Sequence, residues 1–282
     1  MRARNVTGPI AHHAEGPVWA DAWGGLRWVD GDAGDMLTLR DGEVLRTHVD
    51  DEYLAFVRPR QNGGFVAVGA RTLYLADSPD ADAVPVKPLL DDPAIRMNDG
   101  CADPRGRLLT GSMAYASTPG AADLRRVEAD LSVHPVRSGL TVSNGIDFSP
   151  AGDLMFHVDT MTRRIDVYDV VDGDAVDPRP FAAFSEDQGL PDGLCVAADG
   201  SVWVALWGGG AVHGYAPDGR MIARIELPVP QVSACTFGGE ELDVLYITTS
   251  AQGLAPDHGT AAGSLFAASP GVKGMPARAF AG

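Results

Sequence analysis

ADGSVWVAL, residues 198–206, places a tight turn directly before a short apolar strand. Asp-Gly pairs are typical of turns, whereas Val, Trp and Leu here favour extended structure. The same arrangement recurs along the whole chain. The predicted strands cover residues 26–30, 65–68, 107–111, 154–158, 202–206 and 244–248. Each follows a segment rich in Gly, Pro, Asn or Asp, which predicts a chain of repeated turn-and-strand units.

The starts of these strands are separated by 39 to 48 residues. A period of roughly 40 to 50 residues, with several short strands per unit, is the sequence signature of a β-propeller. We therefore expect an all-β fold, a six-bladed β-propeller that forms a single domain over residues 1–282. Residues 3–10 are expected to close the ring by pairing in the last blade. A two-sheet sandwich is the alternative, but it leaves the long period unexplained. Residues 121–127 look weakly helical and are expected to lead into a strand.

The composition argues against several classes of partner. Asp and Glu total 38 against 22 Lys and Arg, a formal net charge of -16, which disfavours binding to nucleic acid or anionic membranes. No segment has the ~20 consecutive apolar residues of a membrane span, and the N-terminus lacks a signal-peptide core. We expect a cytoplasmic monomer or small homo-oligomer. Cys101, Cys195 and Cys235 form no CxxC pair and are expected to be small buried residues.

Three motifs place an oxygen-bearing side chain beside a glycine, namely Glu15-Gly16-Pro17, Asn144-Gly145 and Asp192-Gly193. Taken singly, each resembles an ordinary turn. However, Asn98, Asn144 and Asp192 are 46 and 48 residues apart and share the phase of the repeat. Equivalent positions on successive blades face the same end of the central channel, where a propeller can bind a ligand. Glu15, Asn144 and Asp192 would then offer three oxygen ligands to one hard divalent cation.

Arg96 lies two residues before Asn98, hence on the same face of an extended segment. Its guanidinium could hydrogen-bond hydroxyl or carbonyl oxygens of a polar substrate at the channel mouth. The alternative is a surface arginine paired with Asp91 or Asp92. Arg96 and Asn98 are therefore candidate substrate-binding residues.

Other chemistries lack their motifs. The histidines show no HExxH or HxH spacing, which disfavours a zinc-protease site. The chain has no GxSxG elbow, Walker loop or strand-linked GxGxxG, so serine-hydrolase, P-loop and Rossmann enzymes lack support. His12 and His13 are expected to be an exposed pair, or else to line the entrance. Trp19, Trp207 and Tyr115 are candidates for apolar walls of the site, with core packing as the alternative.

Four motifs in this order resemble the senescence-marker-protein/gluconolactonase family, which includes regucalcin and the luciferin-regenerating enzymes. The motifs are Glu15-Gly16-Pro17-Val18-Trp19, Arg96-Met97-Asn98-Asp99-Gly100, Val142-Ser143-Asn144-Gly145 and Pro191-Asp192-Gly193. The resemblance implies a six-bladed propeller that hydrolyses sugar lactones with one divalent metal ion, Ca²⁺ first, with Zn²⁺, Mn²⁺, Fe²⁺ or Mg²⁺ as alternatives. It also implies that Glu15, Asn144 and Asp192 bind the metal, whereas Arg96 and Asn98 orient the substrate. Residues 114–120 lack the acidic residue that some relatives carry there, which leaves the sugar open.

The expected function is therefore divalent-metal-dependent hydrolysis of a small-molecule aldonolactone to its hydroxy acid. Asp192 is the expected general base, because a ligand carboxylate has a spare oxygen near the attacking water. Activation of the water by the cation alone is the mechanistic alternative. The same metal site could instead act on a phosphotriester, another ester or a biosynthetic intermediate. A non-catalytic binding propeller is the remaining alternative.

Overall fold

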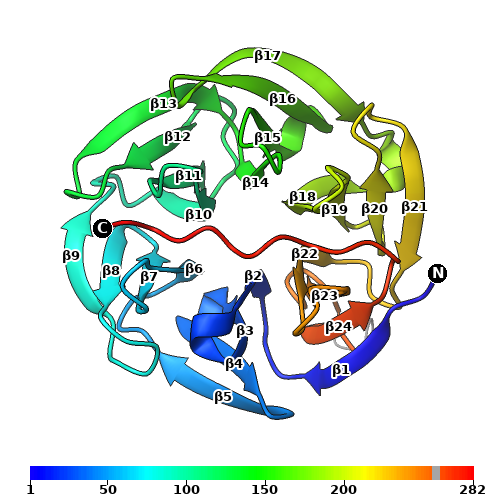
Figure 1. Ribbon diagram of the computed structural model, residues 1–282, viewed down its shortest axis with the longest axis horizontal. Coiled ribbons are helices and arrows are strands. Elements are labelled where there is room, and N and C mark those ends of the chain that lie inside the picture. Colours follow the sequence, from blue (N-terminus) through cyan, green and yellow to red (C-terminus); the bar gives the residue numbers. More distant parts are fainter. Residues whose placement is uncertain (256–260) are drawn as a thin grey trace.

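The computed structural model describes residues 1–255 and 261–282, which form six four-stranded antiparallel sheets around a central channel (Figure 1). This arrangement confirms the expected six-bladed β-propeller. Blade 1 contains β2 (Ala14–Ala20), β3 (Gly25–Asp30), β4 (Asp35–Arg40) and β5 (Glu43–His48). Blade 2 contains β6 (Leu54–Pro59), β7 (Phe65–Gly69), β8 (Thr72–Ala76) and β9 (Val84–Pro88). Blade 3 contains β10 (Ile95–Ala102), β11 (Leu108–Ala114), β12 (Ala122–Val127) and β13 (Val133–Leu140). Blade 4 contains β14 (Ser143–Phe148), β15 (Leu154–Asp159), β16 (Arg164–Val171) and β17 (Asp174–Ala183). Blade 5 contains β18 (Leu190–Val196), β19 (Val202–Trp207), β20 (Ala211–Tyr215) and β21 (Met221–Glu226). Blade 6 contains β22 (Val232–Gly238), β23 (Val244–Thr249), β24 (Ser264–Ala268) and β1 (Arg4–Pro9).

The six recurring strands predicted from the sequence are the second strands of the six blades, β3, β7, β11, β15, β19 and β23. Their apolar side chains are buried because both faces of these strands are covered by neighbouring blades, as for Trp28 and Trp203. Residues 122–127, which looked weakly helical, form the strand β12. Its partners on both sides in the sheet outweigh the mild helical preference of its composition.

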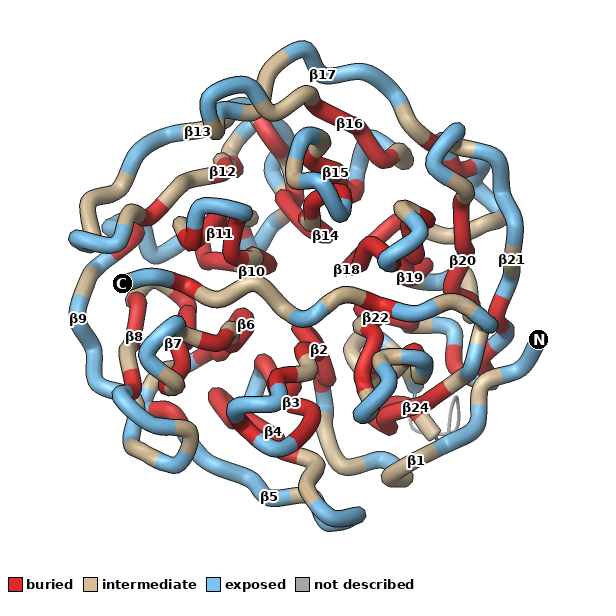
Figure 2. The backbone as a smooth tube through the Cα atoms, in the orientation of Figure 1, coloured by how far each residue is buried: buried red, intermediate tan, exposed pale blue. Residues whose placement is uncertain are grey.

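The ring closes through the N-terminus, as expected. β1 pairs antiparallel with β24, so the first strand of the chain completes the last blade. The outermost strands of the blades are mostly exposed, whereas the strands around the channel are buried (Figure 2). No helix within the described ranges is long and apolar enough to cross a membrane.

The C-terminal segment, residues 269–282, crosses one mouth of the channel from blade 6 toward blade 3 (Figure 1). Its backbone is held at both ends, because Gly274 donates to the Leu242 carbonyl and Ala281 to the Gly106 carbonyl. Between these points Phe280 is fully buried among apolar residues of blades 2 and 3. The segment therefore covers one mouth, which we call the covered mouth.

Candidate metal centre

The innermost strand of every blade carries a β-bulge near its start. The register of each with its neighbouring strand shifts between Glu15 and Val18, Leu54 and Phe56, Met97 and Gly100, Ser143 and Ile146, Pro191 and Leu194, and Val232 and Ala234. A bulge re-aims the side chains at its position. Asn98, Asn144 and Asp192 lie within these bulges, and Glu15 lies at the edge of one. The shared phase seen in the sequence is thus the phase of the bulges, at the mouth opposite the covered one.

The Asn-Gly and Asp-Gly pairs are therefore not hairpin turns, as their local sequence suggested, but interior positions of β14 and β18. Glycine is required there by close approach of the neighbouring blade. A Cβ atom on Gly145 would lie 2.5 Å from the carbonyl oxygen of Asp192 and 2.6 Å from the backbone nitrogen of Leu194. The bulges of neighbouring blades thus pack backbone against backbone, which brings the side chains of Asn144 and Asp192 together.

Asn144 and Asp192 are in direct contact. The Asn144 Nδ2 donates to Asp192 Oδ1 and also to Thr160 Oγ1, at 3.1 Å for the latter, while Asn144 Oδ1 accepts from the Gly145 backbone at 3.1 Å. Both side chains are buried. Two oxygen-bearing groups from blades 4 and 5 therefore meet at one point beside the channel.

Glu15 belongs to the same electrostatic environment. Burial and, after it, the nearby Asp99 carboxylate raise the pKa of Glu15 to about 8, against the Gly16 backbone N–H, which donates to Oε2 at 2.6 Å. Burial, followed by Glu15 and then Asp99, holds the pKa of Asp192 well above its usual range. Buried carboxylates that oppose one another's ionisation are stabilised by a cation between them.

The donor set fits a hard cation. Carboxylate and carboxamide oxygens are the groups that Ca²⁺, Mg²⁺ and Mn²⁺ prefer. Across the described residues no three His, Cys, Asp or Glu side chains gather into a group able to hold a metal ion. A site at this place therefore needs the Asn144 carboxamide beside Glu15 and Asp192, and its ligand set stays a prediction.

Arg96 is buried and not a surface residue. Its Nη1 donates to Asn98 Oδ1 at 2.7 Å and to the Met97 carbonyl at 2.9 Å, and Asn98 Nδ2 donates to the Ser143 carbonyl at 3.1 Å. Within the described part of the chain it forms no ion pair with Asp91 or Asp92. Arg96 and Asn98 thus form a hydrogen-bonded unit that is tied to blade 4 one residue before Asn144.

The aromatic candidates separate into two groups. Trp207 packs edge-on against His13, with ring centroids 5.9 Å apart, and Tyr115 lies 5.9 Å from the Arg96 guanidinium. Trp19 instead stacks on Tyr246, and it lines the cavity at the covered mouth. Trp19 is therefore not a wall of the candidate metal centre.

The two histidines before Glu15 are not an exposed pair. His12 is exposed, whereas His13 is buried and its Nδ1 hydrogen-bonds with Ser250 Oγ at 2.9 Å. Burial, together with Arg96, lowers the pKa of His13 to about 4, so His13 is neutral at physiological pH. Its ring is thus a neutral part of the wall.

Tyr53 and Asp99 also belong to this environment, and Arg58, which lines the cavity at the covered mouth, contacts Asp99 from that side. The Tyr53 ring lies 4.0 Å from the Arg96 guanidinium, and Arg58 donates to the Gly16 carbonyl at 3.0 Å and to Asp99 Oδ1 at 3.3 Å. The repeat phase could have singled out Asp99, which follows Asn98 in the same bulge. Tyr53 and Arg58 come from blade 2, whose inner strand has no carboxylate or carboxamide and hence no motif.

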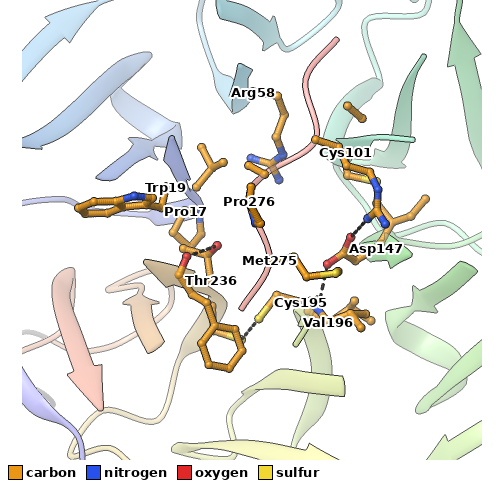
Figure 3. Close-up of a pocket in the computed structure, with 18 residues that line it drawn as sticks. Pro17, Trp19, Arg58, Cys101, Asp147, Cys195, Val196, Thr236, Met275 and Pro276 are labelled. Carbon is orange, nitrogen blue, oxygen red and sulfur yellow. Dashed lines mark hydrogen bonds and ion pairs between the residues drawn. The ribbon is translucent and has the colours of Figure 1, made fainter. Parts of the chain in front are cut away.

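The covered mouth holds a cavity of about 90 Å³ (Figure 3). Cys101, Asp147 and Cys195 line it, each farther along its inner strand than Asn98, Asn144 and Asp192, and Met275 of the C-terminal segment lines it as well. Cys195 and Cys235 face each other with their sulfur atoms 3.8 Å apart, and all three cysteines are free thiols. Cys195 and Cys235 are buried as expected, whereas Cys101 is only partly buried, and burial raises the pKa of Cys195.

Comparisons with known proteins cover nearly the whole chain. A sequence model of the SMP-30/gluconolactonase/LRE-like region matches residues 13–251. Regucalcin from Sus scrofa is 30% identical over 286 residues, which are 96% of this chain and 95% of that protein. YvrE from Bacillus subtilis (strain 168), provisionally named a sugar lactone lactonase, is 32% identical over 84% of this chain and 83% of its own length. A calcium-binding regucalcin from Agrobacterium tumefaciens strain C58 superposes with a TM-score of 0.90 at 25% identity, covering 99% of this chain and 97% of the other. The matched segment includes every strand that carries a candidate site residue.

Proposed function

This chain belongs to the SMP-30/gluconolactonase/LRE-like family, and from that premise we propose that it is a lactone hydrolase that works with one divalent cation. Glu15, Asn144 and Asp192 are the proposed ligands. Ca²⁺ is the first candidate, because a solved relative is described as calcium-binding. Zn²⁺, Mn²⁺, Fe²⁺ and Mg²⁺ are alternatives, since an oxygen-rich site accepts several ions. The substrate class, an aldonolactone, follows from the gluconolactonase and sugar-lactonase names among the relatives.

One observation carries the proposal. Side chains from blades 4 and 5 meet in the contact between Asn144 and Asp192, and the Glu15 carboxylate from blade 1 raises the pKa of Asp192. Residues more than 170 positions apart thus share one buried, electron-rich environment. Such an arrangement costs stability unless a cation neutralises it, which supports a role in binding.

A divalent cation bound there would act as a Lewis acid on the ester carbonyl. Asp192 is proposed to take the proton of the attacking water. One oxygen of this carboxylate would face the cation, and the other would accept that proton. Arg96 and Asn98, held together by their 2.7 Å hydrogen bond, are proposed to orient the oxygens of the lactone so that the carbonyl faces the water.

The metal role is tested by removing the ion. We expect chelation with EDTA to abolish hydrolysis of glucono-δ-lactone, followed with a pH indicator, and Ca²⁺ to restore it. Elemental analysis of the purified protein identifies the ion that it retains. Full activity after thorough chelation would refute the metal role.

Variants test the position of the site. Asp192→Ala is expected to abolish turnover and to weaken Ca²⁺ binding in calorimetry. Asp147→Asn is the matched control, because Asp147 lies on an inner strand at the covered mouth and should leave both properties intact. A panel that sets aldonolactones against paraoxon-like phosphotriesters separates the proposed reaction from its alternative. Turnover of phosphotriesters alone would replace the substrate class but keep the metal site.

A further inference from the structure

Tyr53 immediately precedes β6 and lies beneath the candidate substrate-binding arginine. The Arg96 guanidinium carbon is 4.0 Å from the centroid of the Tyr53 ring, and both side chains are buried, with 8% and 5% exposed. Nη1 of Arg96 is held by Asn98 and by the Met97 carbonyl. The ring and these two acceptors together fix the plane of the guanidinium. Contacts of this kind between arginine and an aromatic face are strongest where water is excluded, as it is here.

The ring is tightly enclosed on the side of blade 1. A Cβ atom on Gly31, in the short 3-10 helix Gly31–Ala33, would lie 2.9 Å from Tyr53 Cε2 and Cζ and 3.0 Å from its hydroxyl oxygen. The backbone of Gly31 has an ordinary negative φ, so the glycine is needed here for space and not for its conformation. Tyr53 thus lies between Gly31 and Arg96.

The hydroxyl of Tyr53 is buried but finds no hydrogen-bond partner among the residues that the structure describes. A buried hydroxyl without a partner destabilises the fold, so such groups are usually satisfied. Burial holds the pKa of Tyr53 above its usual range, with Arg96 opposing this and Glu15, Asp32 and Asp192 adding to it. The phenol therefore stays protonated and can donate a hydrogen bond.

We propose that Tyr53 is a positioning and specificity-determining residue of this site: its ring fixes the Arg96 guanidinium, and its hydroxyl binds an oxygen substituent of the lactone. The inference rests on the proposed lactonase function. It predicts a preference for hydroxylated lactones over unsubstituted ones. The Tyr53 hydroxyl supplies that preference, whereas the orientation of Arg96, which the ring fixes, affects the turnover of every lactone.

Two substitutions separate the two roles. Tyr53→Phe keeps the aromatic face and removes only the hydroxyl. With Ca²⁺-loaded protein, we expect kcat/KM for glucono-δ-lactone to fall about tenfold, mainly through KM, and kcat/KM for δ-valerolactone to stay unchanged. Tyr53→Leu also removes the aromatic face, so kcat/KM for both lactones is expected to fall, by roughly 30-fold for δ-valerolactone.

Two further variants guard against effects of folding alone. Gly31→Ala displaces the Tyr53 ring without removing it, and we expect it to lower kcat/KM for both lactones. Tyr215→Phe is the matched control, since Tyr215 is a buried tyrosine of β20 in blade 5 whose hydroxyl oxygen lies 3.4 Å from His213 Nδ1. It should lower the unfolding midpoint and leave both kinetic constants unchanged.

A readout apart from turnover is the Kd of D-gluconate, measured by calorimetry. We expect Tyr53→Phe to raise it about tenfold and Tyr215→Phe to leave it unchanged. Unchanged kinetics and gluconate binding in Tyr53→Phe, with an active wild-type protein, would overturn the inference and leave the proposed function standing. Equal losses for both lactones in Tyr53→Phe would likewise overturn it, because the preference would not come from the hydroxyl. A wild-type protein that neither hydrolyses a lactone nor binds gluconate would overturn the proposed function and this inference with it.

Discussion

Arg58 of blade 2 contacts blades 1 and 3 beside the candidate centre, and replacing it tests how much these contacts stabilise the fold. Its side chain is only 12% exposed and spans three blades. Nη1 donates to the Gly16 carbonyl at 3.0 Å and to the Val57 carbonyl at 2.8 Å, and Nη2 donates to Asp99 Oδ1 at 3.3 Å. Replacing it by methionine, Arg58→Met, keeps much of the apolar stem but removes the guanidinium. Asp99 then becomes a buried carboxylate without its cation.

The magnitude follows from this loss. Breaking a buried ion pair by removing one partner costs about 3–5 kcal/mol, because the other charge stays buried and unpaired. For a chain of this size each kcal/mol lowers the melting temperature by roughly 2–4 °C, so we expect a fall of roughly 6–20 °C. Adding Asp99→Asn removes the orphaned charge and keeps a side-chain acceptor for the Gly100 N–H. The double variant should therefore be more stable than Arg58→Met, with a coupling energy of about 2 kcal/mol.

The stability that Arg58→Met loses relative to the wild type also depends on pH. Burial raises the pKa of Asp99 above its usual value, while Arg58 lowers it. Without Arg58 the folded-state pKa rises further. Below the unfolded pKa near 4 the carboxyl is protonated in both states, and the deficit is smallest. As the pH rises from there toward the folded pKa, the unfolded chain ionises first and the variant loses additional stability.

The assay is urea unfolding at pH 4.5, 6.0 and 7.5 in the presence of chelator, for the wild type, both single variants and the double variant. Chelator keeps a bound cation from contributing its own stabilisation. Additive effects within about 0.5 kcal/mol, or a deficit of Arg58→Met that does not grow with pH, would refute the reasoning.

Three other predictions follow from buried groups. Burial lowers the pKa of His157 to about 3. Folding stability should therefore fall as the pH drops from about 6.5 toward 3, by at most about 1.4 kcal/mol per pH unit. In urea titrations, His157→Asn should reduce this dependence of stability on pH. Phe280→Ala should cost about 3–5 kcal/mol in unfolding free energy, since Phe280 is fully buried, and an unchanged urea midpoint would show that it does not anchor the C-terminal segment. Gly145→Ala should weaken Ca²⁺ binding about 10- to 100-fold in calorimetry, because its Cβ would push on the backbone of Asp192, and an unchanged Kd would contradict the packing argument.

Local sequence patterns predicted the architecture well because every blade of the propeller repeats the same pattern of a turn followed by an apolar strand. The strand at residues 202–206 and its five equivalents need only an apolar run after a turn, and neighbouring blades then bury it. The closure by β1 was also predictable, because a ring of blades leaves one sheet edge that a terminal strand can fill. Residues 122–127 were ambiguous, since three of six side chains are charged, and pairing on both sides decides the strand.

The candidate centre was predictable only in part. Asn144 and Asp192 stand out by their shared phase, but their local sequence indicates turns, and the bulge depends on contact with the next blade. His13 could not be told from His12, because one residue along a strand separates the buried face from the exposed one. Tyr53 and Arg58 lie in blade 2 and reach across it to other blades, so neither has a local signal.

The two mouths of the channel differ in how their acidic groups are paired. Asp147, at the covered mouth, accepts hydrogen bonds from the backbone of Val196 at 2.8 Å and of Phe148 at 2.8 Å, and it pairs with Arg278 from the C-terminal segment. The protein itself thus supplies the partners of this carboxylate. At the opposite mouth Glu15 and Asp99 raise the pKa of Asp192, and the partners of Glu15 and Asp192 in the described chain are backbone N–H groups and a carboxamide, with Arg58 and Arg96 acting on Glu15 from nearby. Asp147 is thus paired with a cation within the protein, whereas the buried Asp192 accepts only from neutral donors among the described residues, and on this difference we base the proposal that a cation binds at the opposite mouth.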